Sequence, residues 1–363
     1  MVSRQRVPTA ADVARLAGVH ASTVSRSLDP RKRGQVKAAT RERVVLAAAT
    51  LGYHPNLVAS SLRRRQSNTI GVLISSFSNP IYGELLHGIS GELERLGYHL
   101  LITEVPDDAD GDRLSDAIDM MRARGIDGLI CASARGRDAA ILRSLAESGM
   151  PVILCLRWIE ATGIPRVVND DARGGALAAR HLLELGHERI LEIAGPTDIS
   201  TFAERARGFR EVLAESPGSI LYTTVRSATP SVEEGYRVMA GILASGAPFD
   251  ASAVFAHNDL LAVGAIDALA DVGIECPRQV SVVGYNDNPL TGHLQPGLTT
   301  IRLQIDRMGK EAARAVLAVV AERNPVEFVI SLQPELIVRE STITPADARS
   351  TARVEQDLPL DPA

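Results

Sequence analysis

From residue 69 onward, short apolar runs alternate with longer stretches in which apolar residues recur at helical spacing. The short runs are nearly continuous in apolar residues, which is typical of strands covered on both faces of a sheet. A glycine follows each helical stretch, where a left-handed residue can end the helix; these glycines are Gly97, Gly125, Gly149, Gly186 and Gly273. The alternation predicts doubly wound α/β layers, and roughly twelve strands are many for one sheet, so we expect two lobes.

The N-terminal stretch has a different pattern, with two short helices close together. Thr9 is a good N-cap residue and Asp12 follows three residues later, as an acidic variant of the capping box. Gly18 suits the end of this helix, and only residues 18–20 separate it from a second helical stretch, 21–28. Two short helices joined by such a turn predict a helix-turn-helix. On this pattern alone, two ordinary helices of a globular core remain an alternative.

The side chains of the second helix also suit DNA. Small polar residues and Arg26 lie on its outer face, while Val24 and Leu28 face inward. Slim polar side chains allow close approach to the major groove, and a guanidinium can bind base edges or phosphates. A third helical stretch covers residues 40–51. A short segment, 57–62, then precedes a run of arginines, and it is too short to form a stable helix without a partner.

The formal net charge of −5 hides an uneven distribution. Residues 1–66 hold 13 Lys and Arg against 3 Asp and Glu, whereas the rest of the chain holds 26 basic and 41 acidic residues. A basic head on an acidic body is typical of a DNA-binding module attached to a regulatory domain. Because the head carries capped, periodic helices, a solvated basic tail is the weaker interpretation.

Three cysteines without CxxC spacing predict reduced structural thiols, with neither a metal site nor a cofactor. No apolar run reaches the roughly 18 residues of a membrane span. The N-terminus has positive charge but lacks the apolar segment of a signal peptide. We therefore expect a cytoplasmic protein without a membrane partner.

Taken together, residues 9–62 resemble the LacI/GalR family of bacterial transcription regulators. The matching runs are Asp12-Val13-Ala14, Ala17-Gly18-Val19, Thr23-Val24-Ser25-Arg26, Thr40 to Val44, and Leu51-Gly52-Tyr53 through Pro55-Asn56 to Ala59 and Leu62. The resemblance implies a homodimer on a palindromic double-stranded DNA operator, with a hinge helix at 57–62 whose Leu62 wedges into the central base step. It implies DNA contacts from Thr9, His20, Ala21, Ser22, Thr23, Ser25, Arg26, Thr40, Tyr53, Asn56, Ala59 and Leu62.

Some positions depart from the family pattern. His20 stands where the family usually has a Ser or Thr that caps the second helix, and histidine caps less well. Ala21 and Ser22 occupy the two variable positions that set operator preference in the family. So small a pair predicts modest direct base readout there. The basic loop Arg31 to Gly34 is longer than the usual family loop, and the sequence leaves its role open.

The body resembles the type I periplasmic-binding-protein fold that the same family carries. The expected protein is an all-α helix-turn-helix headpiece with a hinge helix, followed by two doubly wound α/β lobes. We expect a headpiece at 1–54, a hinge and linker at 55–68, an effector-binding and dimerisation body at 69–342 and a disordered tail at 343–363. Within the body, we expect one lobe at about 69–162 and 297–330, and the other at about 163–296 and 331–342.

Ligands of doubly wound sheets bind beyond the carboxyl ends of the strands, where this chain places Arg, Asn, Asp and aromatic residues. Such groups suit a polyhydroxy ligand, because an aromatic covers a sugar face while amides and guanidinium groups bind hydroxyls. Arg157 lies in one of these loops. The resemblance implies further effector contacts from Ile81, Tyr82, Thr201, Arg205 and Asn258, with Asn286 or Asp287 at a position that is often acidic.

Leu156 replaces a frequent aspartate, so the hydroxyl-binding pattern of relatives does not carry over directly. Each candidate also has a structural alternative. Asp259 could equally cap the following helix, and Tyr82 could pack between the lobes.

These observations favour an effector-controlled repressor that binds DNA as a homodimer and holds a sugar-like molecule between its lobes. A purine or another metabolite is the second choice of effector, and a solute-binding protein for transport is the alternative class. An enzyme is disfavoured, with no catalytic residues expected. No GxGxxG follows the first strand and no GxxxxGK[ST] occurs in the chain.

Overall fold

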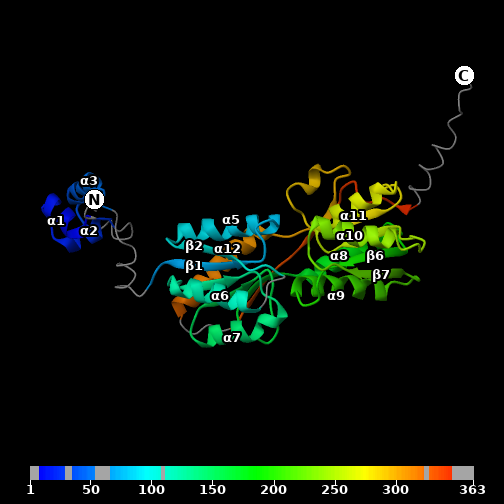
Figure 1. Ribbon diagram of the computed structural model, residues 1–363, viewed down its shortest axis with the longest axis horizontal. Coiled ribbons are helices and arrows are strands. Elements are labelled where there is room, and N and C mark those ends of the chain that lie inside the picture. The colour runs from blue at the N-terminus through cyan, green and yellow to red at the C-terminus, as the bar shows by residue number, and fades with distance from the viewer. Residues whose placement is uncertain (1–7, 29–34, 54–65, 108–110, 323–326, 346–363) are drawn as a thin grey trace, which may run out of the picture. The chain divides into compact units, whose positions relative to one another are not determined.

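The computed structural model describes residues 8–28, 35–53, 66–107, 111–322 and 327–345. The chain divides into two compact units, Met1–Ser67 and Asn68–Ala363. The described part of the first unit consists of α1 (Ala10–Ala17), α2 (Ala21–Leu28) and α3 (Ala38–Leu51). The second unit contains the two α/β lobes (Figure 1).

A small apolar core holds the three helices together. Val13, Val24 and Val44 are fully buried at its centre, one from each helix. Thr9 caps α1 by accepting from the Asp12 N–H, while the Thr9 N–H donates to the Asp12 carboxylate. Gly18 then adopts the left-handed conformation, with φ 64°, and ends the helix. The predicted helix-turn-helix is thereby confirmed.

The second unit contains two sheets of six strands each. Across the first sheet the strands are β2 (His99–Glu104), β1 (Thr69–Ile74), β3 (Gly128–Cys131), β4 (Val152–Cys155), β5 (Arg166–Asn169) and β11 (Val329–Leu332). Across the second they are β7 (Leu221–Arg226), β6 (Arg189–Ala194), β8 (Ala253–Ala256), β9 (Ser281–Asn286), β10 (Thr299–Arg302) and β12 (Glu335–Ile337). Neighbouring strands are parallel except β10 and β12.

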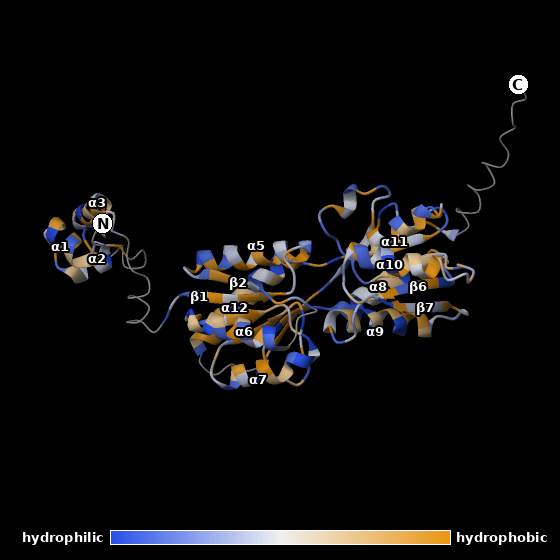
Figure 2. Ribbon diagram, in the orientation of Figure 1, coloured by the Kyte–Doolittle hydropathy of each residue, from blue (hydrophilic) through white to orange (hydrophobic). Residues whose placement is uncertain are grey.

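Helices cover the sheets, as the apolar strands predicted. The first lobe carries α5 (Pro80–Arg95), α6 (Gly111–Ala123), α7 (Ala139–Glu147) and α12 (Ile305–Glu322). The second carries α8 (Asp171–Glu184), α9 (Ser200–Glu215), α10 (Val232–Leu243) and α11 (Asp259–Asp271). Figure 2 shows the apolar strands inside each lobe and helices with one hydrophilic side. Both sheets reverse their strand order, between β1 and β3 and between β6 and β8, and ligands of such sheets bind at these switch points.

The strand pairing corrects the predicted lobe boundaries. β5 pairs with β4 in the first sheet, so the chain crosses after Asn169 rather than near residue 162. β10 pairs with β9 in the second sheet, so the return crossing follows Arg302 rather than Gly297. The prediction was wrong at these strands because a strand of four residues carries no signal of the sheet that it joins.

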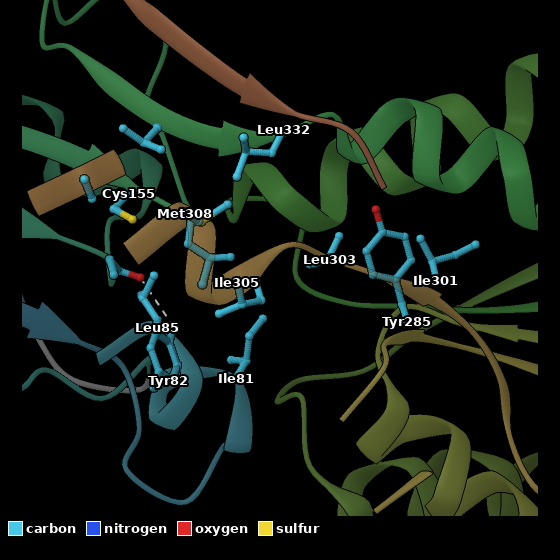
Figure 3. Close-up of a cluster of buried hydrophobic side chains, with 14 of the residues drawn as sticks. Ile81, Tyr82, Leu85, Cys155, Tyr285, Ile301, Leu303, Ile305, Met308 and Leu332 are labelled. Atoms are coloured by element: carbon cyan, nitrogen blue, oxygen red, sulfur yellow. Dashed lines mark hydrogen bonds between the residues drawn. The ribbon is translucent and has the colours of Figure 1, made fainter. Parts of the chain in front are cut away.

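One apolar cluster extends through both lobes along this return crossing. Ile301, Leu303 and Ile305 are buried in the same cluster as Tyr82 of α5 and Tyr285 of β9 (Figure 3). Because side chains of both sheets contribute to this cluster, the two lobes share a packed core in addition to the chain crossings.

The C-terminal segment is attached to the second lobe beyond β12. The Ser341 N–H donates to Gly297 O at 2.9 Å, and the Ile343 N–H donates to Ser281 Oγ at 3.1 Å. His187 lies against the same segment, with Nε2 3.0 Å from Ile343 O and Nδ1 2.9 Å from Ser252 Oγ. The tail predicted from residue 343 therefore starts too early, because Ile343 is bound; residues 346–363 lie outside the described part.

Within the described residues, no helix is long and apolar enough to cross a membrane.

Acid is expected to weaken this C-terminal attachment. His187 is 2% exposed, and burial lowers its pKa to about 4, from 6.5 for a free histidine. A group with a lowered folded-state pKa contributes its full stability above pH 6.5 and loses it as the pH falls towards 4, here by about 3 kcal/mol. His187→Gln lacks this group and should not show the loss. The free energy of unfolding of the variant minus that of wild type, measured by urea denaturation, should therefore rise by most of that amount between pH 7 and about pH 4.5.

The comparison with wild type is needed because other buried groups titrate in this range. Burial raises the pKa of Asp259 to about 7, which makes acid stabilising at that position. The exposed His99, changed to Gln, is the matched control and should follow wild type. Parallel curves for His187→Gln and wild type would contradict the prediction.

Candidate DNA-binding helix and effector site

The outer face of α2 carries side chains predicted to meet DNA. His20, Ser22, Ser25 and Arg26 are exposed, whereas Val24 is fully buried in the headpiece core. Thr9 is also exposed, and the remaining predicted contacts of the described headpiece are half-buried: Ala21, Thr23, Thr40 and Tyr53. The predicted hinge contacts Asn56, Ala59 and Leu62 lie outside the described residues.

His20 caps α2 through its ring. The Ser22 N–H donates to His20 Nδ1 at 3.2 Å, and His20 O accepts from the Thr23 N–H at 2.8 Å. The ring nitrogen thus takes the place of the Ser or Thr oxygen at one of the first N–H groups of the helix, that of Ser22. The sequence pattern gave no reason to expect so complete a cap from histidine.

A buried polar group lies at the carboxyl end of the first sheet. Arg157 donates to both oxygens of Asp107, at 2.5 and 2.9 Å, and to Ser75 Oγ at 3.2 Å. Ser75 Oγ lies 2.7 Å from the Tyr82 hydroxyl, and burial raises the pKa of Tyr82, so that hydroxyl stays protonated. The predicted Tyr82 and Arg157 therefore share one network, in which Asp107 neutralises the arginine. Ile81 packs beside it in the apolar cluster.

The second lobe has a corresponding group around Arg205. This arginine is 2% exposed and donates through Nε to Asp171 Oδ1 at 2.9 Å and through Nη1 to His257 O at 2.5 Å. The Tyr285 hydroxyl donates to the same oxygen of Asp171 at 3.0 Å, and the guanidinium lies 3.7 Å from the centre of the Tyr285 ring. Burial raises the pKa of Asp171 although Arg205 opposes the shift.

Arg205 still has hydrogen-bonding capacity. None of its hydrogen bonds within the described residues uses Nη2. Thr201 lies one turn earlier on α9 and is also buried. A buried guanidinium fixed on two sides, with one nitrogen unused, is suited to grip a ligand oxygen.

A second buried pair, missed by the sequence analysis, supports the loop before α9. His257 Nε2 lies 3.0 Å from Glu192 Oε1, and His257 Nδ1 accepts from the Gly195 N–H at 3.3 Å. Burial acts to raise the pKa of Glu192, but hydrogen bonds from His257 and Thr224, together with the positive charge of Arg210, outweigh it and lower the pKa. The carboxylate is therefore ionised and fully bonded in the middle of β6, where it is buried.

Two predicted effector residues have structural partners instead. Asn258 caps α11 by accepting from the Leu261 N–H at 2.8 Å, and its amide donates to Pro230 O at 3.2 Å. The Asp287 carboxylate receives Arg339 and Arg302, both at 2.6 Å, so its oxygens are occupied. The capping alternative therefore applies at this turn, through Asn258 rather than Asp259.

Three buried asparagines have side-chain atoms without a partner in the described residues. They are both polar atoms of Asn169, Oδ1 of Asn286 and Nδ2 of Asn288. Asn169 ends β5 and Asn286 ends β9, at the carboxyl ends of the two sheets. Unpaired buried amides are costly unless a ligand or water satisfies them. Asn169 was missed because its role depends on β5 joining the first sheet.

Direct contacts join the two lobes beside these groups. Arg135 of the first lobe forms two hydrogen bonds with the Asp198 carboxylate of the second, at 2.8 and 2.7 Å. The Gly136 N–H donates to Asp198 O at 3.1 Å, and the Trp158 N–H donates to Ser200 Oγ at 2.9 Å. The start of α9, the helix of Arg205, is thus tied to the opposite lobe.

Family models match the chain in two parts. Residues 9–56 match "Bacterial regulatory proteins, lacI family", and residues 67–339 match "Periplasmic binding proteins and sugar binding domain of LacI family". The HTH-type transcriptional regulator DegA of Bacillus subtilis (strain 168) is 32% identical over 333 residues, which cover 91% of this chain and 97% of DegA.

Solved structures agree with these matches. A crystal structure of the Lac repressor dimer bound to operator and the anti-inducer ONPF is similar with a TM-score of 0.82 and 27% identity, covering 93% of this chain and all of that one. A complex of the transcriptional regulator CelR with cellobiose is similar with a TM-score of 0.67 and 30% identity, covering 92% of this chain and 99% of that one.

Proposed function

This chain belongs to the LacI family of bacterial regulatory proteins, which are DNA-binding transcription regulators. We propose that two copies bind a palindromic operator as a repressor, with the exposed face of α2 in the major groove of each half-site. Residues 1–54 form the DNA-binding headpiece, 55–68 the hinge and linker, and the body from residue 69 binds the effector and the second copy. The protein acts in the cytoplasm, where bacterial DNA lies.

The effector in this proposal is an uncharged sugar or sugar derivative. The observation that carries it is the set of unpaired buried amide atoms at Asn169, Asn286 and Asn288. Amides offer donors and acceptors together, which matches hydroxyl groups that also do both. The sugar bound to the related CelR is an independent support.

Charge favours the same choice over an anionic effector. Asp107 neutralises Arg157 in the first lobe, and Asp171 neutralises Arg205 in the second. A phosphorylated ligand would bring a charge of about −1.5 to −2 to a buried place where both of these arginines are already paired with a carboxylate. We therefore place Ile81, Tyr82, Thr201, Arg205 and Asn286 around the effector, with Asn169 added.

Effector control follows from the contacts between the lobes. A ligand between the carboxyl ends of the two sheets would favour one lobe arrangement through Arg205 and the start of α9, which Asp198 and Ser200 tie to the first lobe. A coupling free energy of about 1–3 kcal/mol would change operator occupancy 5- to 150-fold.

A thermal-shift screen tests the effector class. Purified full-length protein is heated with neutral sugars, sugar phosphates and purines at saturating concentration. A ligand at about 100 times its Kd adds about 2.7 kcal/mol to the free energy of unfolding, and we expect such a shift from a neutral sugar only. Asn169→Asp and Asn169→Ala should reduce this shift.

Other results would change the proposal in defined ways. A shift from a purine would replace the sugar while keeping the regulator. A sugar phosphate that stabilises more than its neutral sugar would contradict the charge argument. Turnover of the bound ligand would point to an enzyme. Sugar binding without enrichment of any duplex from a random DNA pool would favour a solute-binding protein.

A further inference from the structure

Three exposed polar side chains, from the residue before α2 to its last turn, form a connected chain of hydrogen bonds, the His20–Ser22–Arg26 cluster. Ser22 Oγ lies 2.9 Å from His20 Nδ1. Arg26 donates to Ser22 twice, from Nε to the backbone oxygen at 3.2 Å and from Nη2 to Oγ at 3.4 Å. Ser22, on the exposed face of α2, thus connects the helix cap to the guanidinium of Arg26.

Hydrogen positions in this cluster follow from the cap. Because the Ser22 N–H donates to His20 Nδ1, that nitrogen carries no proton. The Ser22 hydroxyl then shares the single lone pair of Nδ1 with the Ser22 N–H by donating its proton there, and it accepts from Arg26. A base acceptor facing Ser22 would find no free donor, and only one lone pair of Oγ remains.

Arg26, in contrast to Ser22, keeps hydrogen-bond donors that are available to DNA. Two contacts to Ser22 fix its guanidinium plane, while Nη1 and one hydrogen of Nη2 have no partner among the described residues. Two parallel N–H groups in one plane match the N7 and O6 acceptors of guanine in the major groove. An arginine fixed in this way loses less side-chain entropy when it binds a base.

We propose that Ser22 and His20 determine operator choice through Arg26. Arg26 contacts the base, Ser22 orients Arg26, and His20 holds Ser22 in place as a positioning residue. This inference rests on the proposed function, in which α2 lies in the major groove. It assigns Ser22 a different role from the modest direct base readout that its sequence position predicts.

The experiment begins with selection of an operator by the full-length protein from duplexes randomised over about 20 base pairs, the span of two half-sites. Dissociation constants are then measured for the selected duplex and for every single base-pair change in one half-site. Arg26→Ala should reduce discrimination at one base position by about 5- to 150-fold. Ser22→Ala should reduce discrimination at that same position by about 2- to 10-fold, the effect of one hydrogen bond.

Coupled variants separate orientation from direct readout. Ser22→Ala should have no further effect in the Arg26→Ala protein, and Ser22→Thr, which keeps the hydroxyl, should restore the preference. His20→Ala should act at the same base position, whereas His20→Asn replaces the ring nitrogen with an amide oxygen as acceptor and should preserve the preference. Arg15→Ala, on α1, removes an equal exposed charge and should alter affinity for all duplexes alike.

Several outcomes would overturn the proposal. Ser22→Ala and Arg26→Ala acting at different base positions would mean that Ser22 reads its own base. Equal loss of affinity for all duplexes in the His20 and Ser22 variants would leave only a capping role, and unchanged preference would remove both residues from readout. Failure of the wild-type protein to enrich any sequence would instead contradict the proposed function. If His20→Ala unfolds the headpiece, the Ser22 variants and His20→Asn still test the proposal.

Discussion

Arg205→Ala should lower the free energy of unfolding of the body by about 3–5 kcal/mol, the usual result of removing one partner of a buried ion pair. Both side chains of the Arg205–Asp171 pair are 3% exposed, so the carboxylate that remains would have no access to water. Of its two side-chain donors within the described residues, Tyr285 would remain. Urea denaturation of full-length protein measures the loss.

The same helix supplies a matched control. Arg207 lies two residues away, is 51% exposed and pairs with Glu204 and Glu211. Exposed ion pairs contribute about 0–1 kcal/mol, so Arg207→Ala should have little effect. Equal losses from the two variants would show that Arg205 is not buried as described. The double variant Arg205→Ala, Asp171→Ala should lose less than the two single variants added together, because no unpaired charge remains.

Arg205 should also be needed for the effector. Arg205→Lys keeps a positive charge beside Asp171 but loses the planar fork. We expect it to be more stable than Arg205→Ala and yet to show no thermal shift with the sugar that stabilises wild type. A full shift in Arg205→Lys would remove Arg205 from the proposed effector site while leaving its structural role intact.

Gly208→Ala should be destabilising by about 3 kcal/mol or more, because α8 and α9 cross with their backbones in contact. A Cβ at Gly208 would lie 1.8 Å from Ala172 O, and one at Gly175 would lie 2.0 Å from Arg205 O. Neither backbone oxygen can move without its helix. The close crossing is also what brings Asp171 of α8 within 2.9 Å of Arg205 of α9.

Gly241 is the matched control for that substitution. It also lies within a helix, α10, but a Cβ there would meet nothing within 4 Å. Gly241→Ala should stabilise the protein by about 0.5–1 kcal/mol, because alanine restricts the unfolded chain and has a higher helix propensity. A stabilising Gly208→Ala would show that the two helices lie further apart than described. We also expect Gly208→Ala to bind the effector more weakly than Gly241→Ala does.

The helix ends and the fold class could be predicted from the sequence, because they depend on residues close together in the chain. Thr9 and Asp12 predict the start of α1, and Gly18 predicts its end, because capping involves residues within one turn of each other. The glycines that follow the body helices predict their ends for the same reason, and all of those named in the sequence analysis have positive φ. The α/β class followed from apolar runs that alternate with amphipathic stretches.

Tertiary structure decided what depends on residues far apart in the chain. The sequence does not show which lobe the short strands β5 and β10 belong to, and only pairing with β4 and β9 assigns each to its sheet. Asp287 appeared free to bind an effector until folding brought Arg339, 52 residues away, against its carboxylate. Asn169 entered the candidate site for the converse reason, since no side chain of the described residues reaches its amide. Short-range hydrogen bonds are encoded beside the residues that make them, whereas sheet membership and buried ion pairs depend on how the whole chain closes.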